Sequence, residues 1–366
     1  MRVGSATLPL HGGKAPRWLF DRMAQLAPEI VEAIVIEHGR AAFLERISDP
    51  FWFQCFGCVL GFDWHSSGVT TTVCGALKQG LTPRSRDLGL YVAGGKGKAS
   101  RQTPAELIDI GAKTGMNGQR LAYTSRMAAK VDSAAVQDGF GIYHHSFFVS
   151  ADGDWAVVQQ GMRENDSSAR RYHWLGSKVS DFVNEPHAAI ASDADAQLVL
   201  NMVAAESAAA RAASTEFART EPKRVDREIM RVINMALPSR HWVDIRKDVN
   251  PAHLRKVLIA TYEANPETYE RLLSLPGVGP KSVRALAMVA EVIYGSPASM
   301  KDPARFSFAH GGKDGHPYPV NRAVYDTSIA WLRDAVAKAR IGRGERLHAL
   351  RRLDAFQSPP RAQPPM

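Results

Sequence analysis

The chain has 366 residues, of which 45% are hydrophobic, so it can form the cores of two domains. No apolar run approaches the roughly 20 residues that a membrane-spanning helix requires, and the N-terminus lacks the apolar stretch of a signal peptide, which predicts a cytoplasmic protein without membrane contact. The three cysteines, Cys55, Cys58 and Cys74, are too few for a disulfide framework, and their apolar surroundings favour buried thiols over zinc ligands.

The N-terminal half combines helical and strand patterns. Residues 15–37 have the periodicity of an amphipathic helix, interrupted at Pro28. A β-hairpin is the strongest strand signal, because residues 141–150 and 155–161 flank a polar turn. We therefore predict an α+β fold in which residues 1–190 form a mixed α/β domain that is catalytic or binds a ligand. Two further helices are expected at residues 104–113 and 117–136.

Residues 51–78 are rich in aromatic and β-branched side chains, which predicts buried elements on either side of a tight turn that contains Asp63 and His65. Two more imidazoles, His144 and His145, lie on the predicted hairpin. Because strand side chains alternate, only one of the two can share a site with a given neighbour. Phosphodiester hydrolysis uses a divalent cation held by carboxylate and imidazole ligands. We predict catalysis by Asp63, His65, His144 and His145, with Mg²⁺ or Mn²⁺ on Asp63, His65 and His144, although each group alone is more often structural.

Several Gly-rich or basic segments are expected to be loops. Residues 93–98 form a flexible basic loop in this prediction, and residues 170–173 and His187 are loop-borne basic groups that could surround an acidic substrate. One tetrapeptide recurs, with flexible backbone donors, an ammonium and an imidazole, which suits a phosphate. The alternative is two unrelated turns. The two copies are His11, Gly12, Gly13 and Lys14, and His310, Gly311, Gly312 and Lys313.

The sequence of the C-terminal half predicts helices throughout. An Ala-rich helix at residues 193–218 is expected to connect the halves within a linker of residues 191–218. An all-helical domain follows at residues 219–356, and the Pro-rich tail, residues 357–366, is expected to be disordered. Besides a helical hairpin, its expected helices are residues 224–237, 251–265, 320–339 and 345–356.

The hairpin at residues 267–295 is the most informative stretch. Its turn, Leu275-Pro-Gly-Val-Gly-Pro-Lys281, is too rich in helix breakers to continue the first helix, and Pro280 suits the start of the second, which Gly295 can end. The N–H groups of Gly277 and Gly279 can point outward beside a helix N-terminus, where a phosphate oxygen binds well. We expect Val278 to point inward as a hydrophobic plug. The simpler alternative is an ordinary helical hairpin with a Gly-rich turn.

Positive charge is concentrated in the same half. From Arg219 onward there are 25 Lys and Arg against 15 Asp and Glu, whereas the preceding part holds 21 against 22. This division agrees with a phosphate-binding C-terminal module beside a near-neutral partner domain. A solvated basic surface would give the same count.

Four strings together resemble domain-of-unknown-function family 763, a similarity that spans residue 1 to about residue 340 and implies no activity. Separately, residues 275–281 resemble the helix-hairpin-helix of DNA repair and recombination proteins. That resemblance implies sequence-independent binding of single- or double-stranded DNA through its backbone. The implied contacts are Gly277, Val278, Gly279, Lys281, Ser282 and Arg284. The family strings begin at Leu8, Phe56, Arg170 and Phe308.

These observations lead to three hypotheses. The first is a DNA repair nuclease that depends on a divalent metal, and the second is a non-catalytic DNA-binding or recruitment factor. The third is a base-excision glycosylase or lyase, in which Lys281 would attack the sugar; Ser299 and Asn321 stand where the assisting Asp is expected, which disfavours this chemistry. The sequence leaves homo-oligomer formation open.

Overall fold

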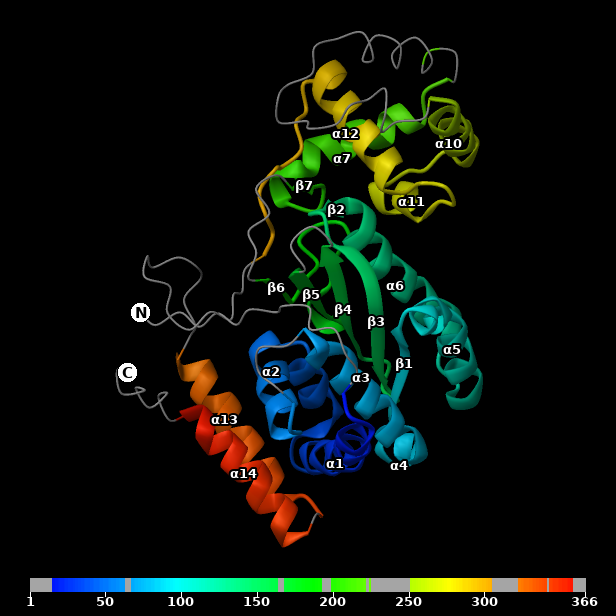
Figure 1. Cartoon of the computed structure of the whole chain (residues 1–366). Coiled ribbons are helices and arrows are strands. Elements are labelled where there is room, and N and C mark those ends of the chain that lie inside the picture. The colour runs from blue at the N-terminus through cyan, green and yellow to red at the C-terminus, as the bar shows by residue number, and fades with distance from the viewer. Residues whose placement is uncertain are drawn as a thin grey trace, which may run out of the picture.

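A computed structural model describes residues 15–62, 67–163, 168–192, 199–221, 224, 251–304, 322–340 and 342–357. It has the predicted α+β character, with one central antiparallel sheet, helices on both of its faces, and a helical module beyond one end (Figure 1). The sheet order is β1-β3-β4-β5-β6. Its strands are β1 (Leu90–Lys96), β3 (Gly141–Ser150), β4 (Trp155–Arg163), β5 (Ser168–Leu175) and β6 (Ala189–Ser192).

The β3–β4 hairpin is confirmed, and its alternating side chains supply two separate cores. On one face, Phe147 and Val157 join the core beneath helices α5 (Lys98–Thr114) and α6 (Gly118–Lys130). On the other face, Phe148 and Val158 join the core beneath helices α1 (Arg17–Ile47), α2 (Pro50–Val59) and α3 (Gly68–Leu81). The sheet is therefore buried on both sides.

Residues 51–78 form the buried elements that were predicted, and both elements are helices. Asp49 begins α2 by accepting a hydrogen bond of 2.8 Å from the Trp52 amide, and Pro50 fits the first helical turn. The three cysteines are buried thiols, as predicted. In α1 the predicted interruption at Pro28 is wrong. That proline lies within the helix, and the backbone leaves helical geometry at Gly39, with φ of 83°.

The Gly-rich segment predicted as a flexible loop at residues 93–98 is instead mostly strand β1. Its glycines allow close approach, since a Cβ on Gly94, where φ is 90°, would lie 2.2 Å from the carbonyl oxygen of His145. A short helix, α4 (Ser85–Leu88), precedes this strand. Local composition therefore predicted flexibility where the fold uses glycine for packing.

After α6 the chain makes a π-helical turn at Val131–Ala135, and β2 (Val136–Gln137) then pairs with β7 (Leu200–Asn201). Because β7 lies within the predicted Ala-rich helix, that prediction is wrong in its first part; the helix itself, α7, is Ala208–Ala218. It packs with α12 in the helical module (Figure 1). The module also contains α10 (Pro251–Ala264), α11 (Tyr269–Ser274) and α12 (Pro280–Tyr294).

The last two helices, α13 (Arg322–Lys338) and α14 (Arg343–Gln357), lie far from this module and pack on α1 and α2 (Figure 1). Trp331 anchors α13. Its ring centroid lies 3.7 Å from the ring centroid of His38 and 4.0 Å from Cζ of Arg46. The segment predicted as one helical domain, residues 219–356, is thus divided between two ends of the molecule. Residues 225–237 and 358–366 lie outside the described residues. None of the described helices is long and apolar enough to cross a membrane.

Helices α5 and α6 approach each other through two glycines. A Cβ on Gly111 would lie 2.6 Å from the backbone nitrogen and Cα of Gly118. We expect Gly111→Ala to lower the free energy of unfolding by about 1–3 kcal/mol, because the rigid backbone opposite must move away. Urea denaturation measures this change. Gly344→Ala, in helix α14 with nothing within 4 Å of the new Cβ, is the matched control and should cost nothing; an equal loss in both variants would contradict the packing argument.

Candidate functional site

The predicted helical hairpin is present in the structure as α11, a five-residue turn and α12. Thr268 caps α11 by accepting a hydrogen bond of 3.2 Å from the Arg271 amide. In the turn, Gly277 has φ of 82°, which glycine adopts without strain, and Val278 is only 1% exposed, so the predicted inward plug is confirmed. Pro280 occupies the first turn of α12.

The outer side of this turn carries backbone N–H groups without acceptors. Within the described part of the chain, no hydrogen bond is made by the N–H groups of Gly277, Gly279, Lys281 or Ser282. Three of these donors lie at the start of a 15-residue helix, where the helix dipole favours negative charge. The Lys281 side chain is exposed beside them. The arrangement can accept an anion.

The turn is fixed from behind by side chains of the sheet domain. Lys130 donates a 2.7 Å hydrogen bond to the carbonyl of Leu275, and burial lowers the pKa of its ammonium. Gln137 donates to the carbonyl of Pro280 at 2.8 Å and accepts from Nε of Arg284 at 2.7 Å. Arg284, predicted as a DNA contact, therefore braces α12 against the sheet domain.

Ser282, also predicted as a DNA contact, is 3% exposed. Its hydroxyl lies 3.4 Å from the carbonyl oxygen of Gly277, across the turn. Its side chain therefore helps to close the turn, while its backbone N–H stays available at the helix start.

The paired histidines of β3 lie on opposite faces, as the strand alternation predicted, and both are buried. His145 Nε2 lies 2.8 Å from the Ser125 hydroxyl and Nδ1 lies 2.8 Å from Gln159 Oε1. His144 Nε2 lies 3.0 Å from the Ser146 hydroxyl. Burial lowers the pKa of His144 to about 3 and also lowers the pKa of His145. Both rings are therefore neutral groups of the interior at pH 7.

Several predicted site residues lie outside the described residues. They include the turn residues Asp63 and His65 and both copies of the recurring tetrapeptide, at residues 11–14 and 310–313. Among the residues that the structure describes, no group of three or more His, Cys, Asp or Glu could hold a metal ion. The metal site on Asp63, His65 and His144 stays a prediction.

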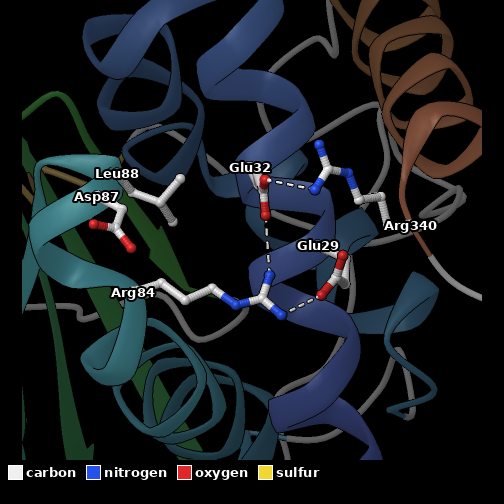
Figure 2. Close-up of a pocket in the computed structure, with 6 residues that line it drawn as sticks. All are labelled: Glu29, Glu32, Arg84, Asp87, Leu88 and Arg340. Carbon is white, nitrogen blue, oxygen red and sulfur yellow. Dashed lines mark hydrogen bonds and ion pairs between the residues drawn. The ribbon is translucent and has the colours of Figure 1, made fainter.

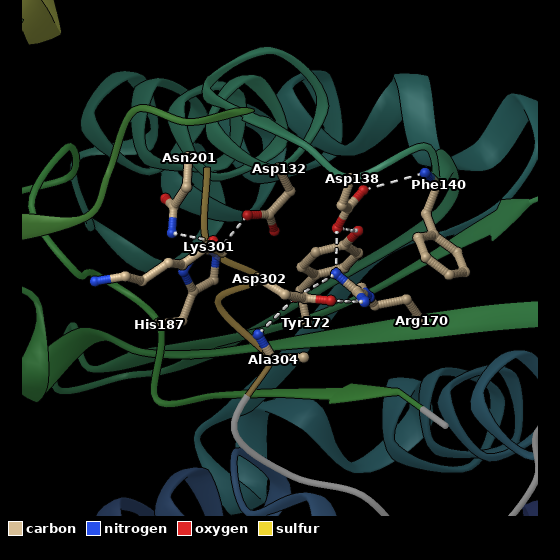
Figure 3. Close-up of polar contacts among 10 residues, drawn as sticks. All are labelled: Asp132, Asp138, Phe140, Arg170, Tyr172, His187, Asn201, Lys301, Asp302 and Ala304. Carbon is tan, nitrogen blue, oxygen red and sulfur yellow. Dashed lines mark hydrogen bonds and ion pairs between the residues drawn. The ribbon is translucent and has the colours of Figure 1, made fainter. Parts of the chain in front are cut away.

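Residues 170–173, predicted as loop-borne basic groups, lie in strand β5 and are buried, so that prediction is wrong. Arg170 lies in an ion-pair network: it donates to Asp138 at 2.9 Å and to both carboxylate oxygens of Asp302, at 2.9 and 2.7 Å (Figure 3). The Tyr172 hydroxyl donates to Asp138 at 2.7 Å. Burial alone would lower the pKa of Arg170, but the charges of Asp138 and Asp302 outweigh it and raise the pKa.

Sequence reasoning missed the second polar cluster drawn in Figure 3, which contains Asp132 and His187. The Nε2 of His187 is hydrogen-bonded to the carboxylate of Asp132, whose side chain is fully buried. An acidic residue beside the apolar Val131 and residues 134–136 is the local signal that could have indicated it. Its partner is 55 residues away in the sequence.

A hollow of about 350 Å³ lies between α1 and the segment before β1 (Figure 2). Most of its charges are paired with one another: Arg84 pairs with Glu29 and Glu32, and Arg340 lies 4.0 Å from Glu32. Such a partly exposed network serves to hold the elements together.

The sequence matches one known protein family. The family model described as "Protein of unknown function (DUF763)" matches residues 4–320. The chain belongs to the DUF763 family. No curated protein and no solved structure is similar enough to this DUF763 protein to add a function or a fold. The family resemblance predicted from the sequence is thus confirmed, and its members' activity must be inferred from the site itself.

The buried histidines should make the free energy of unfolding of this DUF763 protein depend on pH in the acid range. An unfolded histidine takes up a proton near pH 6.5, whereas His144 in the folded chain does so only near pH 3. The unfolded state therefore binds more protons between these values, so stability is fully present above about pH 6.5 and is lost as the pH falls toward 3. His145 and His173, whose pKa values burial also lowers, act in the same direction.

We expect His144→Gln, which can keep a hydrogen bond to Ser146, to remove part of this pH dependence. Between about pH 7.5 and pH 5 the variant should lose about 2 kcal/mol less unfolding free energy than the wild type. Urea denaturation at the two pH values measures the difference. Parallel pH profiles for the two proteins would show that His144 is not protonated on unfolding.

Proposed function

We propose that the protein binds the sugar-phosphate backbone of DNA through the α11–α12 hairpin, acting as a helix-hairpin-helix. The carrying observation is the set of free N–H groups at Gly277, Gly279, Lys281 and Ser282 beside an exposed ammonium. Phosphate oxygens accept such hydrogen bonds, and the helix start adds a favourable dipole. Because phosphates carry no base identity, the binding would be independent of sequence.

The rigidity of the turn supports this proposal. Lys130 and Gln137 hold the turn carbonyls from behind, so the N–H groups on its outer side need no rearrangement before a ligand arrives. A donor set that is ordered in advance loses less entropy on binding. The excess of positive charge after Arg219 would add long-range attraction to a polyanion.

Gly279 supplies a further argument. Its φ of −132° and ψ of −168° are open to any residue, and nothing lies within 4 Å of a Cβ built there. The described fold therefore gives no internal reason for glycine at this position. A side chain would, however, occupy the space through which a phosphate must approach the N–H groups.

This argument gives a sharp test. We expect Gly279→Val to fold normally and to weaken DNA binding by about tenfold or more, because the branched side chain blocks the donors. Fluorescence anisotropy with single- and double-stranded oligonucleotides measures affinity, and thermal unfolding checks the fold. Unchanged affinity in this variant would reject the hairpin as the DNA contact.

Lys281→Gln should weaken binding to all sequences alike and reduce the slope of log affinity against log salt by about 1. Lys113→Gln is its matched control, since this exposed lysine near the end of α5 carries the same charge away from the hairpin. A salt slope that changes equally in both variants would indicate non-specific charge effects alone.

The three hypotheses for the role of DNA binding predict different experimental outcomes. A nuclease that depends on Mg²⁺ or Mn²⁺ predicts that cleavage of DNA stops with chelator and with Asp63→Ala or His65→Ala. A non-catalytic binding factor predicts salt-dependent affinity without cleavage. A base-excision enzyme predicts a borohydride-trapped crosslink between abasic DNA and Lys281, which Lys281→Gln would abolish.

A further inference from the structure

Helix α6 packs against α11, the first helix of the hairpin (Figure 1). Two hydrogen bonds join them: Tyr123 donates to the carboxylate of Glu270 at 2.6 Å, and Lys130 donates to the carbonyl of Leu275 at 2.7 Å. Glu270 lies near the start of α11 and Leu275 directly follows its end. The two helices therefore run alongside each other in the same direction, and the end of α6 lies at the hairpin turn.

Arg126 lies between these two attachment points, three residues after Tyr123 and four before Lys130. With 3.6 residues in each helical turn, it is about 40° from Lys130 around α6 and about 6 Å from it along the axis. Its side chain is exposed, and no described residue pairs with it. The fold therefore places an available guanidinium one helical turn from the ammonium that contacts the hairpin turn.

The backbone that carries Arg126 is fixed relative to the hairpin. Leu121 and Met127 of α6 belong to the same hydrophobic core as Leu272 of α11 and Leu286 of α12. Movement of α6 past the hairpin would have to break this core as well as the two hydrogen bonds. A cation that is positioned in advance loses less entropy when it binds a ligand.

The charges of α6 and the hairpin favour an anion at this surface. Helix α6 contains three basic residues and no acidic one. Asp132, in the π-helical turn that follows, is buried and accepts hydrogen bonds inside the protein. In the hairpin segment, Glu267 and Glu270 lie at the end of α11 that is distant from the turn, and Glu291 lies near the end of α12. The surface between Arg126 and the turn is therefore positive in these elements.

The spacing of the cations suits a polyanion. Phosphates follow one another at about 3.4 Å along the axis of each strand of B-DNA, so a separation of about 6 Å corresponds to about two phosphates. A single phosphate would be bound fully by the N–H groups of the turn and Lys281. A strand has further phosphates, which can also reach Arg126.

We propose that α6 extends the phosphate-binding surface of the hairpin, and that Arg126 binds a second phosphate of the strand whose first phosphate is bound at the turn. This inference rests on the proposed DNA binding and adds the path of the strand, which runs from the outer side of the turn along α6. A guanidinium suits this role because it donates two parallel N–H groups to phosphate oxygens.

A pair of variants on one helix tests this path. We expect Arg126→Gln to weaken binding of single- or double-stranded oligonucleotides about fivefold and to reduce the slope of log affinity against log salt by about 1. Arg126→Lys keeps the charge and should retain most of the slope. Fluorescence anisotropy at several salt concentrations measures both quantities, and circular dichroism confirms that each variant is folded.

Arg120→Gln is the matched control. Arg120 is also exposed on α6, but it lies about 80° from Lys130 on the side opposite to Arg126 and about 15 Å away along the axis. Its substitution should change neither the affinity nor the salt slope. Equal effects of Arg126→Gln and Arg120→Gln would overturn the proposed path.

A double variant shows whether Arg126 and Lys281 bind separate phosphates. Counterion release depends on the number of phosphates that the protein neutralises. If the two cations bind separate phosphates, Arg126→Gln combined with Lys281→Gln should reduce the salt slope by about 2. A reduction of only about 1 would show that they share one phosphate and would reject the second contact.

The Gly279→Val variant separates failure of this inference from failure of the hairpin contact. If Gly279→Val weakens binding while Arg126→Gln behaves like Arg120→Gln, the hairpin contact stands and the path along α6 is wrong. Unchanged binding in Gly279→Val would overturn both, because the path begins at the turn.

Discussion

The ion pair between Arg170 and Asp302 is the contact on which the arrangement of the molecule depends. It joins the middle of β5 to the segment that leaves α12, and both nitrogens of the guanidinium fork take part. Arg170 is fully buried and also pairs with Asp138 at 2.9 Å, so its guanidinium needs both carboxylates to satisfy its charge and its donors inside the protein. The pair therefore ties the segment that leaves the helical module to β5.

The helical module is joined to the sheet by packing as well as by charge. One hydrophobic core runs without a break from Leu107 and Phe147 under the sheet to Leu272 and Leu286 in the module. Tyr123 of α6 adds a 2.6 Å hydrogen bond to Glu270 of α11. The proposed DNA contact is thus a projecting part of one continuous structure, and its orientation relative to the sheet is set by buried surface.

The sequence was informative where structure is local. The β3–β4 hairpin and the α11–α12 turn were predicted because their turn residues and apolar spacing determine the geometry over a few residues. The burial of Arg170 was not predictable in this way, since its partners are 32 and 132 residues distant. Its charge indicated a surface loop, and only the assembled fold supplies the carboxylates that permit its burial.

The candidate site residues also differ in whether the local sequence or distant parts of the chain determine their role. Val278 and the exposed Lys281 follow from the local motif, whereas the role of Arg284 changed because Gln137, from another part of the chain, lies beside it. A cavity of about 520 Å³ beside β6 could not be predicted at all. It is formed by three segments that are separated in the sequence, residues 185–190, 201–206 and 299–303, and the hydrogen bond from His187 to Asp132 beside it joins the loop before β6 to the π-helical turn.

The π-helical turn has a consequence for communication within the molecule. Residues on both sides of it, Lys130 and Gln137, hold the hairpin turn, and Asp132 within it holds His187. A stretch of eight residues is thus attached to two surfaces at once. If a ligand bound at one surface displaces this stretch, the affinity of the other surface for its own ligand changes. Thermodynamic reciprocity then requires the second ligand to change the affinity for the first by the same factor.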